Sequence, residues 1–206
     1  MADTVEKPSS PAARTIAQLS REAQSCRRCA LYKNATQTVF GEGSPRAAIM
    51  FVGEQPGDQE DRQGRPFVGP AGRLFDQALA EAGIDREETY VTNAVKHFKY
   101  EPRGKKRIHK RPDRGEIEAC RWWLHAEIRL IKPKLIVALG ATAARALSGR
   151  TVTISKLRGE TLEFQGHMGL VTVHPSFLLR VPDAASRAEE YRKFITDLKR
   201  AARLGA

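Results

Sequence analysis

The chain has 206 residues, of which 41% are hydrophobic and 29% charged, enough for one globular domain with a normal core. Lys and Arg number 35 against 24 for Asp and Glu, a formal net charge of +11, which fits either a nucleic-acid partner or a basic but unspecialised surface. Membrane proteins, secreted disulfide scaffolds and fibrous repeats are excluded, because no apolar run reaches the ~18 residues of a membrane span and the polar N-terminus does not resemble a signal peptide. We expect a cytoplasmic protein.

The predicted elements follow one another as alternating strands and helices. Residues 1–13 are expected to form a disordered tail, followed by a single domain over residues 14–206. Apolar spacing and end signals predict helices at residues 14–24, 70–82, 116–131, 141–147 and 184–204. Short apolar runs predict strands at residues 47–53, 89–95, 135–139 and 169–173. This alternation predicts an α/β fold with a four-stranded parallel sheet covered on both faces.

The remaining segments are expected to connect these elements. Residues 54–69, rich in Gly and Pro, and residues 96–114, rich in Lys and Arg, read as loops. Residues 148–165 leave room for a small hairpin.

Polar residues follow three of the predicted strands. Glu54 and Gln55 follow the first strand, Asn93 lies near the end of the second, and His174 to Ser176 follow the fourth. Because ligands bind at the carboxyl ends of parallel strands, we expect these side chains to form one site.

Two of the three cysteines form a Cys-x-x-Cys motif, Cys26 and Cys29. His97 and Cys120 are the next soft or imidazole ligands along the chain, so four ligands could hold zinc or an iron–sulfur cluster. The alternative is that Cys120 is a buried core cysteine and that the motif is a redox pair at the surface.

Six segments resemble motifs of the iron–sulfur uracil-DNA glycosylases of family 4, in the family's order and over about residues 20–200. They are GEQPG (53–57), GRPFVGPAG (64–72), TNAVK (92–96), CRWWL (120–124), KPKLIVALG (132–140) and HPSFLLR (174–180). The basic segment GKKRIHK (104–110) resembles the loop of the UdgX branch, whose members become covalently fixed to DNA after excising uracil. The resemblance implies a three-layer α/β/α glycosylase fold. It also implies uracil-containing DNA as substrate, with single strands preferred, free uracil as product, and a monomer.

The resemblance implies a [4Fe–4S] cluster on Cys26, Cys29, His97 and Cys120. His97 departs from the family pattern, because the family places its third cysteine there. An imidazole in place of a thiolate removes one negative charge from the cluster. Excision of a base involves no net redox step, so we expect the cluster to be structural.

The resemblance also assigns roles in the base pocket. Phe67 would stack on uracil, and the amide of Asn93 would face its N3–H and O4 atoms, with backbone groups around Gln55 completing this edge. His174 would donate a hydrogen bond to uracil O2 as negative charge develops there. Glu54 would stabilise the positive sugar or accept a proton. Core packing by Phe67 and strand-end capping by His174 are the alternatives.

The role of His109, in the basic segment, decides between two forms of the glycosylase reaction. In the UdgX-like reading, His109 attacks C1′ of the sugar, and the enzyme turns over once. The alternative is a phosphate-binding loop with an incidental histidine, which would leave a conventional multi-turnover glycosylase. A non-enzymatic, metal-stapled DNA-binding module is the third hypothesis.

Nine Lys or Arg residues against two acidic residues in segment 96–114 predict a phosphate-binding surface. The expected DNA contacts are Lys105, Lys106, Arg107, Lys110, Ser176 and Arg180. For Arg107, packing within the loop to hold His109 is the alternative to a phosphate contact.

Overall fold

The computed structural model describes residues 13–206. The predicted disordered tail (residues 1–13) therefore lies outside the described residues, except for Ala13, which is buried. Within the described part of the chain, no helix is long and apolar enough to cross a membrane.

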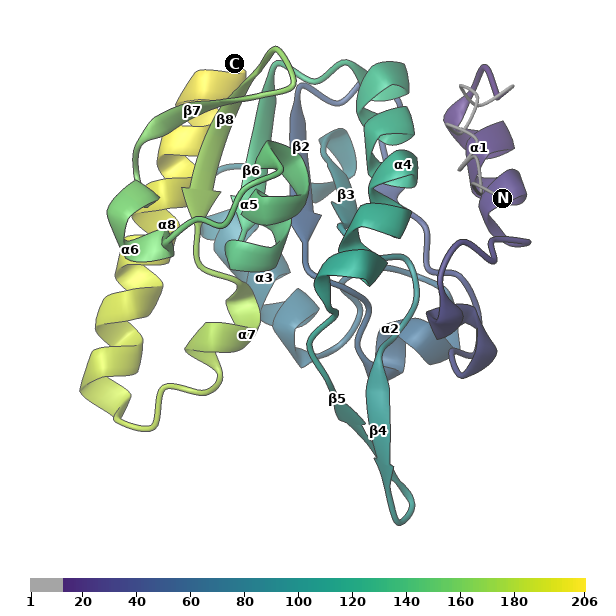
Figure 1. The fold of residues 1–206 in the computed structure, drawn as a ribbon. Coiled ribbons are helices and arrows are strands. Elements are labelled where there is room, and N and C mark those ends of the chain that lie inside the picture. The colour runs from purple at the N-terminus through teal and green to yellow at the C-terminus, as the bar shows by residue number, and fades with distance from the viewer. Residues whose placement is uncertain (1–12) are drawn as a thin grey trace.

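A six-stranded sheet forms the middle of the molecule (Figure 1). Its central strands run parallel in the order β3 (Tyr90–Asn93), β2 (Ile49–Gly53), β6 (Leu135–Leu139) and β8 (His167–Thr172). Every residue of β2, β3 and β6 is buried, as expected for parallel strands covered on both faces. The four predicted strands are confirmed, and their carboxyl ends lie along one edge of the sheet.

Two antiparallel edge strands correct the predicted number of strands from four to six. β1 (Glu42–Gly43) pairs with β3, and β7 (Thr161–Phe164) pairs with β8. With only two residues, β1 is too short for a recognisable pattern. β7 turns into β8 through Gln165 and Gly166, whose φ angles of 55° and 82° suit a two-residue hairpin turn. Residues 148–165, expected to add a small hairpin, supply only β7, the first strand of this hairpin; its second strand, β8, is the fourth predicted strand.

Helices cover the sheet in two layers (Figure 1). They are α1 (Ile16–Ala23), α3 (Pro70–Glu81), α4 (Arg114–Ile131), α5 (Ala141–Ser148) and α8 (Ala184–Gly205). α4 and α5 lie on one face, with α1 against α4, and α3 and α8 lie on the other. Strand side chains alternate between the two resulting cores, with Met50 and Val52 in one and Ile49 and Phe51 in the other. All five predicted helices are confirmed, with small shifts at their ends.

Short helical segments occupy several connections. They are η1 (Ala30–Lys33), α2 (Asp58–Gln63), η2 (Arg86–Glu88), α6 (Ile154–Leu157) and α7 (Pro175–Leu178). α2 lies within residues 54–69, which were expected to be a loop, because six residues are too few for a helical period to be visible. The Glu60 carboxylate of α2 accepts hydrogen bonds from the backbone N–H groups of Gly57 and Gly69, at 3.1 and 2.8 Å. This buried carboxylate holds both ends of the segment together.

The basic segment 96–114 also contains regular structure rather than only loop. β4 (Tyr100–Arg103) and β5 (Lys106–His109) form a hairpin that projects from the body of the molecule (Figure 1). Gly104 takes the positive φ of 56° that its two-residue turn requires. Pairing places His109 opposite Tyr100, and Arg107 on the same face two residues earlier. The high density of charge hid this strand pattern in the sequence.

A buried ion pair joins the central sheet to α4. Lys96 and Glu127 have fully buried side chains, and Lys96 Nζ lies 2.6 Å from Glu127 Oε2. The ammonium also donates to Thr92 Oγ1 and to the backbone oxygen of Asn93, at 2.5 and 2.8 Å. Glu127 Oε1 accepts from the Tyr90 hydroxyl at 3.0 Å. Hydrogen bonds surround both charges, as a buried ion pair requires.

Removal of one charge of this pair is expected to be far more harmful than removal of both. Lys96→Met should lower the free energy of unfolding by about 3–5 kcal/mol, because Glu127 is left charged and buried. The double variant Lys96→Met/Glu127→Leu should recover most of that loss. Urea denaturation measures both effects.

Arg114→Met is the matched control, because Arg114 is 75% exposed in its pair with Glu118 and such surface pairs contribute less than about 1 kcal/mol. A double variant as unstable as Lys96→Met would contradict this interpretation.

Candidate active site

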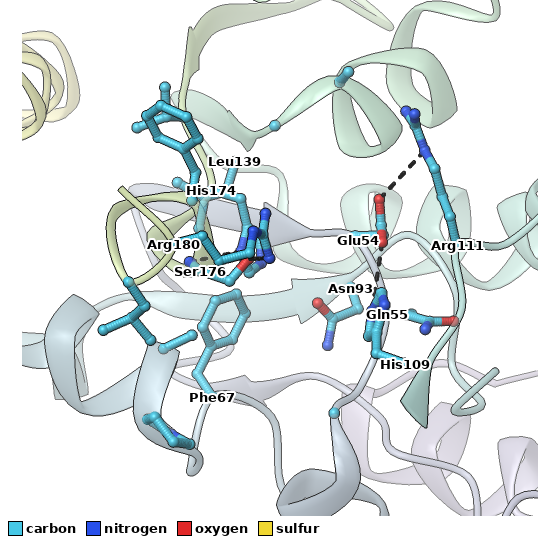
Figure 2. A pocket seen from close by; sticks show the side chains of 18 of the residues that line it. Glu54, Gln55, Phe67, Asn93, His109, Arg111, Leu139, His174, Ser176 and Arg180 are labelled. Carbon is cyan, nitrogen blue, oxygen red and sulfur yellow. Dashed lines mark hydrogen bonds and ion pairs between the residues drawn. The ribbon is translucent and has the colours of Figure 1, made fainter. Parts of the chain in front are cut away.

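A cleft of about 1380 Å³ lies at the carboxyl ends of the central strands (Figure 2). Eight of the residues predicted to form the site line it: Glu54, Gln55, Phe67, Asn93, His109, His174, Ser176 and Arg180. They come from five different segments, among them the projecting hairpin. The fold therefore brings the residues at the strand ends together in one cleft, as predicted.

Gly53 brings two of these side chains together. It ends β2 and lies opposite Asn93 of β3 in the sheet register. A Cβ atom at Gly53 would overlap Asn93 Oδ1 and come within 2.7 Å of Phe67 Cζ. Both side chains thus occupy space that any other residue at position 53 would fill. Phe67 has a φ of 57°, a conformation that is uncommon for a residue with a side chain.

His174 is held as a hydrogen-bond donor toward the cleft. Its Nδ1 accepts from the Ser176 backbone N–H at 3.1 Å and lies 2.9 Å from Ser176 Oγ. Burial, followed by the charges of Arg180 and His109, lowers the pKa of His174 to about 4, so the ring is neutral at pH 7. With Nδ1 as acceptor, the proton of the neutral ring resides on Nε2. The ring stacks on Phe67, with centroids 6.0 Å apart.

Glu54 is the hub of a polar network across the cleft (Figure 2). Its Oε2 accepts a hydrogen bond from the Thr142 hydroxyl and lies 3.7 Å from Arg111 Nε. Its other oxygen, Oε1, lies 3.5 Å from His109 Nε2. Arg111 Nε also donates to Thr142 Oγ1 at 3.2 Å. One carboxylate oxygen is therefore held by α5 and the other is left facing the histidine.

His109 ends β5 and reaches over the cleft beside Glu54. Its side chain is 49% exposed, and its ring lies 6.1 Å from the ring of Phe98. Burial lowers the pKa of His109 below its ordinary value of 6.5, against the opposing effect of Glu54. The ring is therefore neutral at pH 7, with a lone pair available.

Arg107 anchors the hairpin instead of extending into solvent. Its Nε lies 2.5 Å from Asp58 Oδ1, and its Nη1 lies 2.6 Å from Asp61 Oδ2. The guanidinium also lies over the rings of Phe98 and Tyr100. These contacts favour the packing alternative for Arg107, in which it positions the hairpin, because two carboxylates of α2 already engage its charge.

Gln55 fastens the base of the same hairpin. Its Nε2 donates to the backbone oxygens of Lys99 and Lys110, both at 3.1 Å, and its Oε1 accepts from the Lys99 N–H at 3.1 Å. The side chain is therefore occupied, which leaves its backbone for the base-edge role expected of this residue. No local signal in the sequence reveals this contact, since the partners lie 44 and 55 positions away.

The other predicted DNA contacts are distributed around the cleft. Lys105, Lys106 and Lys110 are exposed on the hairpin. Arg180 Nη1 donates to Ser176 Oγ at 3.2 Å, so its guanidinium lies beside His174 (Figure 2). Ser176 acts on His174 and Arg180 within the protein.

Thr142 and Arg111 are site residues that the sequence analysis missed. Thr142 is the second residue of α5, just beyond the carboxyl end of β6. Its position at the same sheet edge as Glu54 was the signal that could have identified it.

The four expected cluster ligands come from three parts of the chain. Cys26 and Cys29 lie between α1 and η1, His97 follows β3, and Cys120 is in α4. Burial raises the pKa of Cys120 to about 12, with smaller contributions from Cys26 and Cys29. The three sulfurs therefore lie near one another, with Cys26 and Cys120 buried and Cys29 partly exposed.

Several polar groups surround these ligands. Trp123 Nε1 donates to Cys26 Sγ, and the Lys96 N–H donates to Cys120 Sγ, both at 3.1 Å. His97 Nε2 lies 3.0 Å from Thr38 Oγ1, whereas its Nδ1 is buried without a hydrogen-bond partner. Such an unpartnered buried nitrogen is costly and is suited to ligation.

The spacing of these groups does not match a single ion. Among residues 13–206, no three His, Cys, Asp or Glu side chains converge closely enough to hold one metal ion. A four-iron cluster binds each ligand to a different iron atom, so its ligands stand farther apart than those around one ion. The donor types present, three thiols and one imidazole, are those that iron–sulfur clusters use.

Comparison with known proteins assigns the chain to a family. The profile of the Uracil DNA glycosylase superfamily matches residues 40–199. The chain belongs to this superfamily. It is 40% identical over 181 residues to a type-4 uracil-DNA glycosylase of Thermotoga maritima, covering 87% of this chain and 88% of the relative. It is 37% identical over 186 residues to that of Archaeoglobus fulgidus (86% and 90% covered) and 35% identical over 193 residues to that of Sulfurisphaera tokodaii (89% and 84% covered).

In a glycosylase of this superfamily, Gly53 should limit the shape of the base pocket. Gly53→Ala is expected to reduce uracil release from DNA by at least about 10-fold, because the new methyl group displaces Asn93 and Phe67. Single-turnover assays of uracil release measure this loss.

Affinity for uracil-free DNA should remain within about 2-fold, since phosphate contacts supply it. Gly115→Ala is the control for a glycine substitution, because Gly115 lies in the first turn of α4 and a Cβ atom there would meet only Asp113 Oδ1, at an ordinary 3.5 Å. Equal losses in both variants would show that the effect is not local.

Proposed function

We propose that this chain is a uracil-DNA glycosylase that excises uracil, mainly from single-stranded DNA, and becomes linked through His109 to C1′ of the resulting abasic site. The observation that carries the proposal is the 3.5 Å separation of His109 Nε2 from Glu54 Oε1, in the same cleft as the base-pocket residues. The superfamily match and the type-4 relatives support the glycosylase reaction, and the hairpin supports the covalent outcome.

The base pocket suits an extruded uracil. The target nucleotide must leave the base stack or already be single-stranded before it can enter. Phe67 provides a stacking surface, and the Asn93 amide accepts from N3–H and donates to O4. Cytosine presents the reverse pattern at these positions, so it would leave the buried amide unpaired.

His174 would stabilise the leaving group. When the C1′–N1 bond breaks, its electron pair moves to uracil, and negative charge accumulates on O2. The Nε2–H of neutral His174 can donate to O2 without giving up its proton. This is preorganised electrostatic stabilisation, and it requires the neutral tautomer that Ser176 imposes.

His109 would supply the nucleophile. A ring nitrogen shares its lone pair with C1′ as the C1′–N1 bond breaks, and the Glu54 carboxylate stabilises the positive charge on sugar and ring. The imidazolium then loses its remaining N–H proton, and the uracil anion gains one. The product is a neutral N-glycosyl imidazole and free uracil. The new bond between the imidazole and C1′ has no easy route to cleavage, so each protein molecule would react once.

A conventional multi-turnover reaction is the second candidate. The names of the type-4 relatives favour it. In that reaction, water attacks C1′ where His109 would otherwise do so, and the protein is released unchanged.

We further propose a [4Fe–4S] cluster on Cys26, Cys29, His97 and Cys120. Burial of Cys26, His97 and Cys120, the two N–H groups directed at sulfur and the unpartnered His97 Nδ1 support this assignment. The cluster would supply structural cross-linking, because it ties the segment before η1 to α4 and to the loop after β3.

The adduct gives the sharpest test of the reaction. Wild-type protein with uracil-containing single-stranded DNA should give a complex that survives heat and detergent, and His109→Ser should lower its yield by at least about 100-fold. Uracil release can persist in His109→Ser, since water then has room at C1′. Denaturing gels and mass spectrometry of the trimmed complex measure both, with the DNA remnant expected on the peptide that contains His109.

Glu101→Ser, at an exposed position of the same hairpin, should leave the adduct intact. The rate of adduct formation should stay level from pH 8 to 6.5 and decline only at lower pH. The folded-state pKa of His109 is lowered, so the reactive neutral ring persists below its ordinary pKa. An undiminished adduct in His109→Ser would refute the nucleophile, and free abasic product alone would support the second candidate.

Metal analysis tests the cluster independently of activity. Anaerobically purified protein should be brown, with about four irons and four sulfides per chain. His97→Cys should retain the iron, since a thiolate replaces the imidazole, whereas His97→Ala should lose part of it. A colourless protein with one zinc would overturn the assignment.

A further inference from the structure

The outer side of α4 and α5 carries a group of arginines that the proposed reaction does not use. We define the arginine face as Arg114, Arg121, Arg129, Arg145 and Arg150. The three on α4 follow one side of the helix, since they lie seven and eight residues apart. Arg145 is on α5, which lies beside α4 (Figure 1), and Arg150 follows it. Two helices and the connection after them thus carry the five arginines at neighbouring places in the fold.

These groups are gathered rather than scattered. Glu118 lies within the electrostatic influence of Arg114, Arg121 and Arg145 at once. Arg121 lies against Gly149, where a Cβ atom would come within 3.1 Å of its guanidinium. Four of the five arginines are therefore neighbours in space, since Arg121 also lies with Arg129 beside His125.

Little negative charge offsets the arginine face. Within the described part of the chain, the only ion pair made by these five arginines joins Arg114 to Glu118. His125, near Arg121 and Arg129, carries no negative charge. Burial, followed by the charges of these two arginines, lowers its pKa to about 4. By contrast, Lys193 on α8 pairs with both Glu189 and Glu190. Like charges on neighbouring helix turns destabilise a helix slightly. A bound polyanion would relieve this repulsion, so the arginine face favours binding one.

The arginine face is continuous with the cleft. Arg111 touches the Glu54–Thr142 network and lies three residues before Arg114, where α4 begins. From Arg114 to Arg129, α4 rises about 22 Å, a length along which a nucleic-acid strand presents several phosphates. Guanidinium groups suit phosphates because they can donate two parallel hydrogen bonds.

We propose that the arginine face binds the phosphates of the DNA strand on one side of the target nucleotide, guiding that flank from the cleft along α4 and α5. The inference rests on the proposed function, which places DNA in the cleft. In this arrangement, the hairpin lysines and Arg180 contact the target nucleotide itself. The arginine face contacts a single flank of the strand, either the 5′ or the 3′ flank.

Two oligonucleotides with a flank on only one side test this assignment. Each carries one 2′-fluoro-2′-deoxyuridine, which resists excision, with twelve nucleotides only on its 5′ side or only on its 3′ side. Fluorescence anisotropy at several salt concentrations gives the affinity and its salt slope. The variant is Arg121→Gln/Arg145→Gln, and Lys199→Gln/Arg203→Gln on α8 removes the same charge from the opposite layer.

The arginine variant should bind one of the two oligonucleotides on the order of 25-fold more weakly at 0.1 M salt, with a salt slope smaller by about 1.4, since each phosphate contact contributes about 0.7 for single strands. The other oligonucleotide should bind as before, and the control variant should bind both normally. Arg121→Lys/Arg145→Lys should retain most of the affinity. Equal losses for both oligonucleotides, or no loss for either, would overturn the proposal.

Failure of the proposed function would look different. Adduct yield on a five-nucleotide uracil substrate should be the same in the wild type and in Arg121→Gln/Arg145→Gln, because the short strand does not reach the arginine face. Absence of adduct in both proteins would count against the His109 reaction only. The flank-specific loss of binding would still decide the role of the arginine face.

Discussion

The buried pair of Lys96 and Glu127 is the interaction on which the arrangement of the site depends. Two charges without contact to water are costly to bury, so the chain surrounds them with hydrogen bonds from β3 and α4. The ammonium of Lys96 also fixes the backbone oxygen of Asn93, while its own N–H reaches Cys120. One residue thus connects Asn93, whose amide is proposed to read the base, with the expected cluster ligands.

One side of the cleft is built on the central sheet, and the other side is supplied by the β4–β5 hairpin. Glu54 and Asn93 extend from strand ends whose backbones are paired in the central sheet, so their positions vary little. His109 instead comes from a hairpin outside that sheet, which the side chains of Gln55 and Arg107 hold at its base and along its face. Two carboxylates of α2 fix Arg107 at little entropic cost, because the arginine also stacks on aromatic rings of the hairpin. The fold therefore adds His109, the proposed nucleophile, beside the cleft without altering the strand-end residues of the pocket.

Local patterns predicted the central strands and the long helices because each has enough residues for a period to be visible. The same reasoning failed for β1, α2 and the β4–β5 hairpin, which are short or dominated by charge. It located Glu54, Asn93 and His174, since strand ends meet at one edge of a parallel sheet. It could not find the clamp of Gln55 or the contact of Thr142 with Glu54, because these join residues 44 to 88 positions apart, and their pairing depends on tertiary packing alone. For Arg107, the sequence showed the charge and the fold decided its partner.

The electrostatics of the two active-site histidines separate their roles. Both rings are neutral at pH 7 because burial lowers their pKa values, yet they differ in what surrounds them. Ser176 occupies Nδ1 of His174, so this ring offers only a proton to the cleft. His109 is half exposed beside Glu54, so its ring can approach a sugar while a carboxylate compensates the charge that it gains. A single cleft therefore contains one imidazole that can donate a hydrogen bond and another with a lone pair available beside a carboxylate, which suits the two roles proposed for them.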